Sequence, residues 1–120
     1  MIIDDEEKIR TLLAKIISLE GFEVLTAGDG KAGLRKLEQH EVDIIICDVK
    51  LPDGSGVDLS RTIKEKYPTT EIILLTAFAN IPDSVQAIKN GAFDYISKGD
   101  DNNRIIPLLY KAAEKTALNK

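Results

Sequence analysis

The sequence has one cysteine, one histidine and no tryptophan among its 120 residues. A single thiol, Cys47, excludes an internal disulfide framework and a thiolate cage around a metal ion. Cys47 closes an apolar run that starts at Ile44, so we expect a buried structural thiol rather than a reactive one. The lone His40 lies in a charged stretch and is interpreted as a surface residue without a chemical role.

The chain also lacks an excess of basic residues and any long apolar segment. Its net charge is −4, which argues against direct binding of nucleic acid, because a surface that holds the phosphate backbone is basic. No apolar run approaches the roughly 20 residues of a membrane span, and acidic residues begin at Asp4, where a signal peptide would be apolar. We therefore expect a cytoplasmic protein without membrane contact that forms one domain over residues 1–120.

Short apolar runs alternate with amphipathic segments along the whole chain. We expect strands at 1–3, 22–26, 43–47, 71–75 and 93–96, and helices over 9–17, 30–39, 56–66, 82–91 and 105–113. Gly21 is expected to stop the first helix, Asp29 to cap the second, and Ser55 with Asp58 to form a capping box for the third. Residues 51–54 are expected to form a turn.

The strand at 43–47 is apolar almost throughout, as a parallel strand covered on both faces requires. Five strands separated by single helices predict a parallel sheet with helices on both faces. The expected fold is α/β, a flavodoxin-like (βα)5 doubly wound five-stranded parallel sheet with strand order 2-1-3-4-5.

Polar side chains follow the strands of this predicted sheet. Asp4 and Asp5 follow the first strand, Asp48 the third, Thr76 the fourth and Lys98 the fifth. Ligands of such sheets bind outside the carboxyl ends of the strands, at the switch point between the first and third. Three carboxylates in one crevice repel each other, so a cation is expected, and an all-oxygen site suits Mg²⁺ better than zinc.

Asp48 is the candidate nucleophile because its strand is central, and carboxylates can form acyl phosphates. Thr76 could then hydrogen-bond a phosphoryl oxygen, and Lys98 could offset its charge. Each residue also has a plainer explanation: Asp4 or Asp5 could cap a helix, and Asp48 could be a turn residue. The functional interpretation is favoured because capping alone would not place all five residues at strand ends.

With these residues the sequence resembles the receiver domain of bacterial two-component response regulators, over essentially its whole length. The resemblance is carried by the segments 3–6 (IDDE), 43–48 (DIIICD), 51–56 (LPDGSG), 74–77 (LLTA) and 91–98 (GAFDYISK). It implies the same flavodoxin-like topology, so the strand order is not an independent result of the periodicity.

The resemblance implies that Asp48 is the phosphoryl acceptor and that a sensor histidine kinase is the donor. It implies that Mg²⁺ is bound directly by Asp5, through water by Asp4, and also by Asp48 and the backbone carbonyl of Lys50. The domain would be no enzyme toward other substrates, although it would phosphorylate and dephosphorylate itself. Because the Lys50 side chain offers no carboxamide to orient a water molecule, we expect slow self-dephosphorylation.

Further roles are implied for the residues that respond to the phosphoryl group. Thr76 and Lys98 match the phosphoryl-sensing positions, and Tyr95 matches the aromatic switch residue, although it could simply be a half-buried strand aromatic. The segment 91–95 is similar to receivers of the nitrogen-regulation type, which precede an ATPase that activates sigma-54 promoters. The resemblance thus implies a role in transcription regulation and a C-terminal output domain beyond Lys120. Rotation of Tyr95 would change a surface with the mixed charges of Lys89, Asp94, Arg104 and Lys111, so we expect phosphorylation to promote pairing with an identical copy or with a following domain.

Two positions depart from the family pattern. Gly99 stands where the family usually has proline after the lysine, and the first strand is shorter than usual, as in a fragment of a longer protein or one that has lost its natural start. Two other functions are less consistent with these residues. A phosphohydrolase of the haloacid dehalogenase class needs an aspartate where this chain has Lys50, and a pseudo-receiver would not need the complete set of polar residues.

Overall fold

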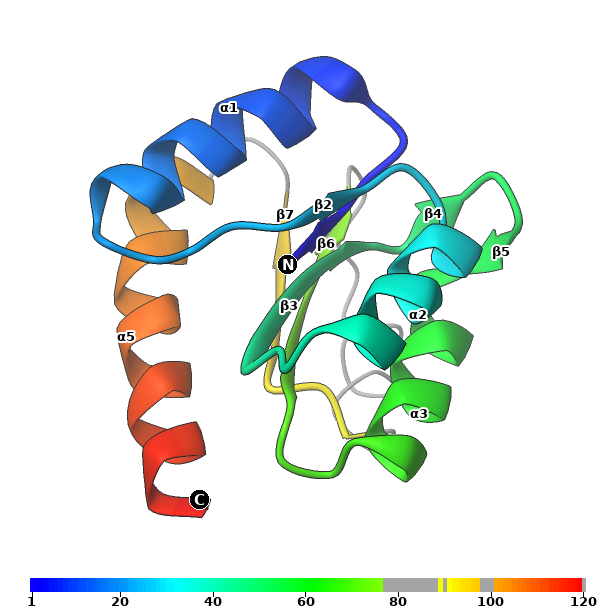
Figure 1. Ribbon diagram of the computed structural model, residues 1–120. Helices are drawn as coiled ribbons and strands as arrows, with labels where there is room; N and C mark the ends of the chain where they lie inside the picture. Colours follow the sequence, from blue (N-terminus) through cyan, green and yellow to red (C-terminus); the bar gives the residue numbers. More distant parts are fainter. Residues whose placement is uncertain (77–88, 90, 98–100, 120) are drawn as a thin grey trace.

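A five-stranded parallel sheet forms the centre of the computed structural model, which describes residues 1–76, 89, 91–97 and 101–119 (Figure 1). The strands are β1 (Ile2–Ile3), β2 (Thr26–Ala27), β3 (Ile44–Asp48), β6 (Glu71–Thr76) and β7 (Asp94–Ser97), and a separate antiparallel ribbon consists of β4 (Lys50–Leu51) and β5 (Gly54–Ser55). The helices are α1 (Glu7–Leu19), α2 (Gly30–Gln39), α3 (Gly56–Lys66) and α5 (Asp101–Asn119). The sheet order β2-β1-β3-β6-β7 confirms the predicted order, because the ribbon takes no part in the sheet.

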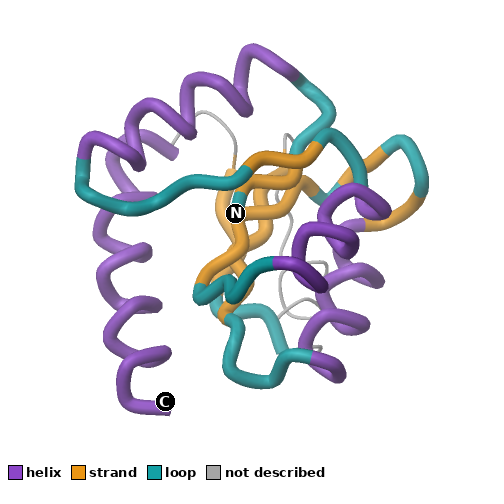
Figure 2. Tube along the Cα trace, viewed as in Figure 1, coloured by secondary structure: helices purple, strands orange, loops and turns teal. Residues whose placement is uncertain are grey.

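Helices cover both faces of the sheet. Helices α1 and α5 lie on one side, and α2 and α3 lie on the other (Figures 1 and 2). Along β3, Ile45 and Cys47 pack into the core on the α2/α3 side, whereas Ile44 and Ile46 pack on the α1/α5 side. This double burial explains why the strand is apolar up to Asp48, as predicted.

The helix boundaries follow the local signals. Helix α2 has the predicted bounds, and the Asp29 side chain accepts a hydrogen bond from the Ala32 N–H at 2.7 Å. Helix α1 ends just before Gly21, whose φ of 92° is a conformation that side chains disfavour. Ser55 caps α3 but accepts from the Val57 N–H, not from the N–H three residues on that a capping box predicts.

One strand differs from the prediction. The second strand was expected at 22–26 but is found at Thr26–Ala27, because its partner β1 offers only Ile2 and Ile3 for pairing. Phe22 instead packs against the α1/α5 core. The turn expected at 51–54 is confirmed, because Pro52 and Asp53 form a turn between β4 and β5 and Leu51 pairs with Gly54. Most of the helix expected at 82–91, namely residues 82–88 and 90, lies outside the described part of the chain.

The final helix confirms the predicted inner face in part. Ile105, Leu109 and Ala112 are buried against the sheet, whereas Leu108 and Ala113 are partly buried at the margin of the same core. Among the described helices, none is both long and apolar enough to cross a membrane.

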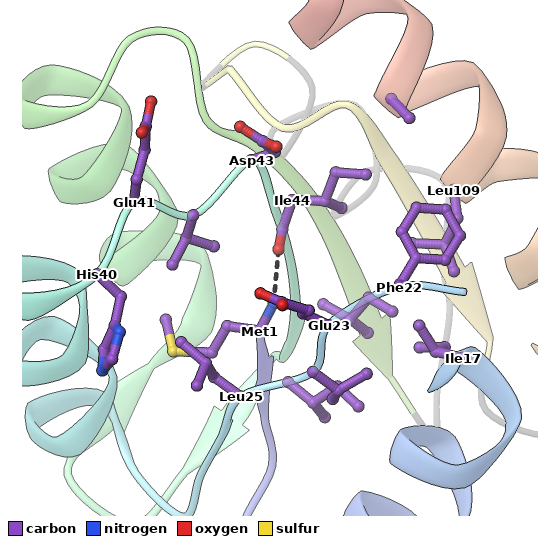
Figure 3. A pocket seen from close by; sticks show the side chains of 15 residues that line it. Met1, Ile17, Phe22, Glu23, Leu25, His40, Glu41, Asp43, Ile44 and Leu109 are labelled. Atoms are coloured by element: carbon purple, nitrogen blue, oxygen red, sulfur yellow. Dashed lines mark hydrogen bonds between the residues drawn. The ribbon is translucent and has the colours of Figure 1, made fainter. Parts of the chain in front are cut away.

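A pocket of about 460 Å³ opens at the amino ends of the strands (Figure 3). There the α-amino group of Met1 donates a hydrogen bond to the Ile44 carbonyl at 2.7 Å. Burial lowers the pKa of this amine to about 6, although nearby Asp43 opposes the shift. The pocket lies at the opposite end of the sheet from Asp4 and Asp48, so we do not assign the predicted chemistry to it.

Candidate functional site

Three buried polar residues lie where neighbouring strands end. Asp4 follows β1, Asp48 ends β3 and Thr76 ends β6, and their exposed fractions are 1%, 4% and 8%. Because β1, β3 and β6 are adjacent and parallel, their carboxyl ends lie at one edge of the sheet. The structure therefore brings together the strand ends that the sequence predicted to form a site.

The carboxylates that converge are those of Asp4, Glu6 and Asp48. Each offers an oxygen atom, and these atoms lie within 4.8 Å of one another. Asp5, the predicted direct metal ligand, is exposed and is not part of this group. Asp5 lies in a bend, and the Glu6 N–H that follows it donates to Asp4 Oδ1 at 2.9 Å, so the turn of the chain brings Glu6 back beside Asp4. The sequence offered no local signal that distinguished Glu6 from Asp5, because the choice depends on this turn.

The donor set fits a hard cation. All three side chains of the group offer carboxylate oxygen, and the group contains neither imidazole nor thiolate. Oxygen ligands of this kind are those that Mg²⁺ prefers, whereas structural zinc is usually held by sulfur and nitrogen. The acidic group is thus a site that could bind Mg²⁺.

The chain after Asp48 folds back over its own strand. The Lys50 N–H donates to Asp48 Oδ1 at 3.3 Å, and the Gly56 N–H donates to the Val49 carbonyl at 2.7 Å. Gly56 approaches so closely that a Cβ atom there would lie 2.0 Å from the Asp48 carbonyl oxygen. A glycine at this position is therefore required for the ribbon to close beside Asp48, a role the sequence reasoning did not assign.

Cys47 is a buried structural thiol, as predicted. Its exposed fraction is 1%, and its Sγ donates to the Asp48 carbonyl at 3.3 Å. Burial, together with the carboxylates of Asp48, Asp4 and Asp53, raises the pKa of the thiol and keeps it protonated. His40 is exposed at the end of α2, in agreement with its interpretation as a surface residue.

Tyr95 lies on β7 beside Leu74 of β6. Its exposed fraction is 8%, and its ring belongs to the core on the α2/α3 side, so it is more deeply buried than the half-buried aromatic that we considered. Lys98 and Gly99 lie outside the described residues, and the predictions for them stay predictions.

Residues 1–110 match the sequence profile of the response regulator receiver domain, so the chain belongs to this family. It is 35% identical over 122 residues to a putative NtrX-like response regulator of Rickettsia bellii, a match that covers the whole chain and 26% of the relative. It is 34% identical to the response regulator protein PilR of Pseudomonas aeruginosa over 93% of the chain and 25% of that protein. The chain thus spans about a quarter of the length of these relatives.

Solved structures agree with this assignment. The beryllofluoride-activated NtrC4 receiver domain dimer superposes with a TM-score of 0.91 at 31% identity and covers 96% of this chain and 95% of that one. The receiver domain of NtrX from Brucella abortus has a TM-score of 0.88 at 32% identity and covers 94% and 96%. These similarities confirm the receiver fold and the predicted likeness to receivers of the nitrogen-regulation type. The chain belongs to the receiver family and not to the haloacid dehalogenase class that we considered as an alternative.

Proposed function

We infer that this domain accepts a phosphoryl group on Asp48 from a sensor histidine kinase in a reaction that depends on Mg²⁺. The observation that carries the proposal is the buried Asp48 carboxylate, which ends the central strand and converges with the carboxylates of Asp4 and Glu6. Such a group of negative charges is stabilised by a cation. The family of the chain supports the same conclusion.

Asp4, Asp5 and Asp48 would hold the ion, together with the backbone carbonyl of Lys50. The positions of Asp4 and Asp48 support their share of this set, and the Lys50 carbonyl belongs to the ribbon that folds back beside Asp48. Glu6 is a further carboxylate at the same place, whereas Asp5 would have to turn inward from its exposed position. When bound, Mg²⁺ would offset the charge of the carboxylates and of the incoming phosphoryl group.

In the proposed transfer, an oxygen of the Asp48 carboxylate forms a bond to phosphorus while the phosphorus–nitrogen bond of the phosphohistidine breaks. The nitrogen keeps the electron pair of that bond. Thr76, at the end of the neighbouring strand, would then donate its hydroxyl to a phosphoryl oxygen, and Lys98 would offset its charge. Tyr95 would report this change to the surface as the switch residue. The Lys50 side chain would leave self-dephosphorylation slow.

We propose that residues 1–120 form the receiver domain of a longer protein. Because the chain covers about a quarter of its relatives, an output domain would follow it and act in transcription regulation. The acidic balance of the chain supports a receiver that does not itself bind nucleic acid. A cytoplasmic location, where a histidine kinase presents its phosphohistidine, fits the receiver family.

Labelling with a small phosphodonor tests the acceptor. We expect acetyl phosphate with Mg²⁺ to add one phosphoryl group, which trapping and mass spectrometry would map to Asp48. Asp48→Asn should lose the label because the amide cannot act as the nucleophile, and chelation of Mg²⁺ should prevent labelling of the wild type. The matched control is Asp58→Asn, which changes an exposed aspartate on α3 and should be labelled like the wild type. Wild-type label in Asp48→Asn would refute the assignment.

Phosphorylation is further proposed to promote a homodimer. The similar NtrC4 receiver domain forms a dimer in its beryllofluoride-activated state. We expect beryllofluoride with Mg²⁺ to raise the sedimentation coefficient of the wild type and to do so less in Thr76→Ala, which lacks the hydroxyl that would sense the phosphoryl group. If beryllofluoride binds and the wild type remains monomeric at all concentrations tested, this domain does not use dimerisation as its output.

A further inference from the structure

Asp53, at the tip of the β4–β5 ribbon, makes a two-point contact with the start of helix α2. Its Oδ1 accepts a hydrogen bond from the Gly30 N–H and its Oδ2 accepts one from the Lys31 N–H, each at 3.0 Å. The third N–H of this turn, that of Ala32, is bound by the Asp29 side chain. The free N–H groups at the start of α2 are thus bound partly by its own cap and partly by a carboxylate more than 20 residues further along the chain.

The contact depends on a gap that Gly30 leaves. A Cβ atom on Gly30 would lie 3.3 Å from Asp53 Oδ1 and 3.4 Å from Oδ2, which is tight for the carboxylate. The hydrogen bonds from the Gly30 and Lys31 N–H groups lower the pKa of Asp53, so its side chain is charged at neutral pH. The positive end of the α2 dipole also favours a negative charge at this point.

The ribbon connects this contact to the proposed metal site. Lys50 pairs with Ser55 at the base of the ribbon, and its N–H donates to Asp48 Oδ1 at 3.3 Å. The ribbon has two residues in each strand, and Asp53 lies at its two-residue tip, three positions after Lys50. Such a short ribbon is marginally stable alone, so its position depends on what anchors its two ends. The base is bonded to Asp48, and the tip is bonded to α2 through Asp53.

We propose that Asp53 is a positioning residue for the metal site: by bonding the tip of the ribbon to α2, it fixes the Lys50 backbone carbonyl where Mg²⁺ would be bound. This inference rests on the proposed function, because it assigns the support of the same site. Asp53 itself is exposed and is not a ligand. A group that orients a ligand strengthens metal binding because the ligand need not be ordered when the ion arrives.

Two rival explanations make different predictions. If the negative charge of Asp53 merely attracts Mg²⁺ through space, then Asp53→Ala and Asp53→Asn should weaken binding equally, and Gly30→Ala should not weaken it. If Asp53 merely stabilises α2, its loss should lower the unfolding temperature without changing Mg²⁺ affinity in the folded protein. If Asp53 positions the ribbon, Gly30→Ala should weaken binding although every charge is kept.

Calorimetric titration with Mg²⁺ alone, at a temperature where circular dichroism shows all variants folded, separates these cases. We expect Asp53→Ala to raise the dissociation constant about tenfold, the size of effect typical for groups that support a ligand. Asp53→Asn should lie between this variant and the wild type because one oxygen acceptor remains. Gly30→Ala should weaken binding by a smaller factor than Asp53→Ala, because its methyl group requires the carboxylate to shift by only a few tenths of an ångström. Asp58→Asn removes an equal charge from an exposed site on α3 and should bind like the wild type.

Amide spectra provide the direct check on the contact. Shifts of the Gly30 and Lys31 signals in Asp53→Ala would show that the contact is lost, and changed Lys50 and Asp48 signals would show that the ribbon has moved. Wild-type Mg²⁺ affinity in a folded Asp53→Ala with a lost contact would overturn the inference and leave the proposed function intact. A wild type that does not bind Mg²⁺ would overturn both.

Discussion

Replacing Gly56 with alanine is expected to destabilise the domain by about 3 kcal/mol and to slow labelling of Asp48 about 100-fold. The added methyl group would lie 2.0 Å from the Asp48 carbonyl oxygen, a distance that no pair of such atoms tolerates. The atoms in the way belong to the backbone, so rotation of a side chain cannot relieve the clash. Either the ribbon or the end of β3 must move, and each carries part of the proposed site.

Urea unfolding and acetyl phosphate labelling measure the two effects. Gly28→Ala is the matched control, because a Cβ atom there meets only Arg10 Nη1, which donates to the Asp4 carbonyl, at an ordinary contact distance of 3.4 Å. We expect this control to change the free energy of unfolding by less than about 1 kcal/mol and to label like the wild type. A Gly56→Ala protein with the urea midpoint and the labelling rate of the wild type would contradict the geometry of the closed ribbon.

Loss of the Lys64 charge is the second change with a large expected effect. Lys64 Nζ lies 3.2 Å from Glu71 Oε1, and the exposed fractions of the two side chains are 18% and 1%. Lys64 also donates to the carbonyls of Pro68 and Thr70, each at 3.0 Å. Lys64→Met keeps most of the apolar stem and, among the residues that the structure describes, leaves the buried carboxylate with one cationic partner, Lys115, at 3.3 Å. We expect a loss of about 3 kcal/mol, because one partner of a buried ion pair is removed.

Chemical unfolding of three variants tests this expectation. Lys115→Met is the matched control, since its side chain is 51% exposed, and we expect it to cost less than about 1 kcal/mol. Adding Glu71→Leu to Lys64→Met should recover part of the lost stability, because an apolar side chain needs no ionic partner. A Lys64→Met protein that unfolds at the wild-type denaturant concentration would show that the pair contributes little.

This ion pair lies at the opposite end of β6 from Thr76. Glu71 is the first residue of β6, and its two lysines belong to α3 and α5, which cover opposite faces of the sheet (Figure 1). Lys115 also lies over the Phe93 ring at 5.7 Å from its centre. The charged residues at the start of β6 hold α3 and α5 to the sheet, whereas those at the carboxyl ends of the strands form the proposed site. We therefore expect Lys64→Met to lower stability without preventing the labelling of Asp48 in folded protein.

The sequence by itself determined the architecture and the principal residues of the site. The apolar residues of β3 are buried on alternate faces, so only a parallel strand between two layers of helices accommodates them. Once the strand order follows, Asp4, Asp48 and Thr76 must meet at one edge, because parallel strands end on the same side. The burial pattern follows from periodicity and the common edge from chain direction, which a sequence carries directly, whereas the strand order also depended on the resemblance to receiver domains.

Only the tertiary structure decided how that edge is completed. It placed Glu6 rather than Asp5 in the acidic group, since the direction of a side chain past a strand depends on how the chain leaves the sheet. It shortened β2 because the partner strand, not the local sequence, sets the length of a pairing. It also joined Asp53 to α2 and brought Gly56 against Asp48. Such contacts depend on the distance between segments remote in sequence, and no local pattern specifies that distance.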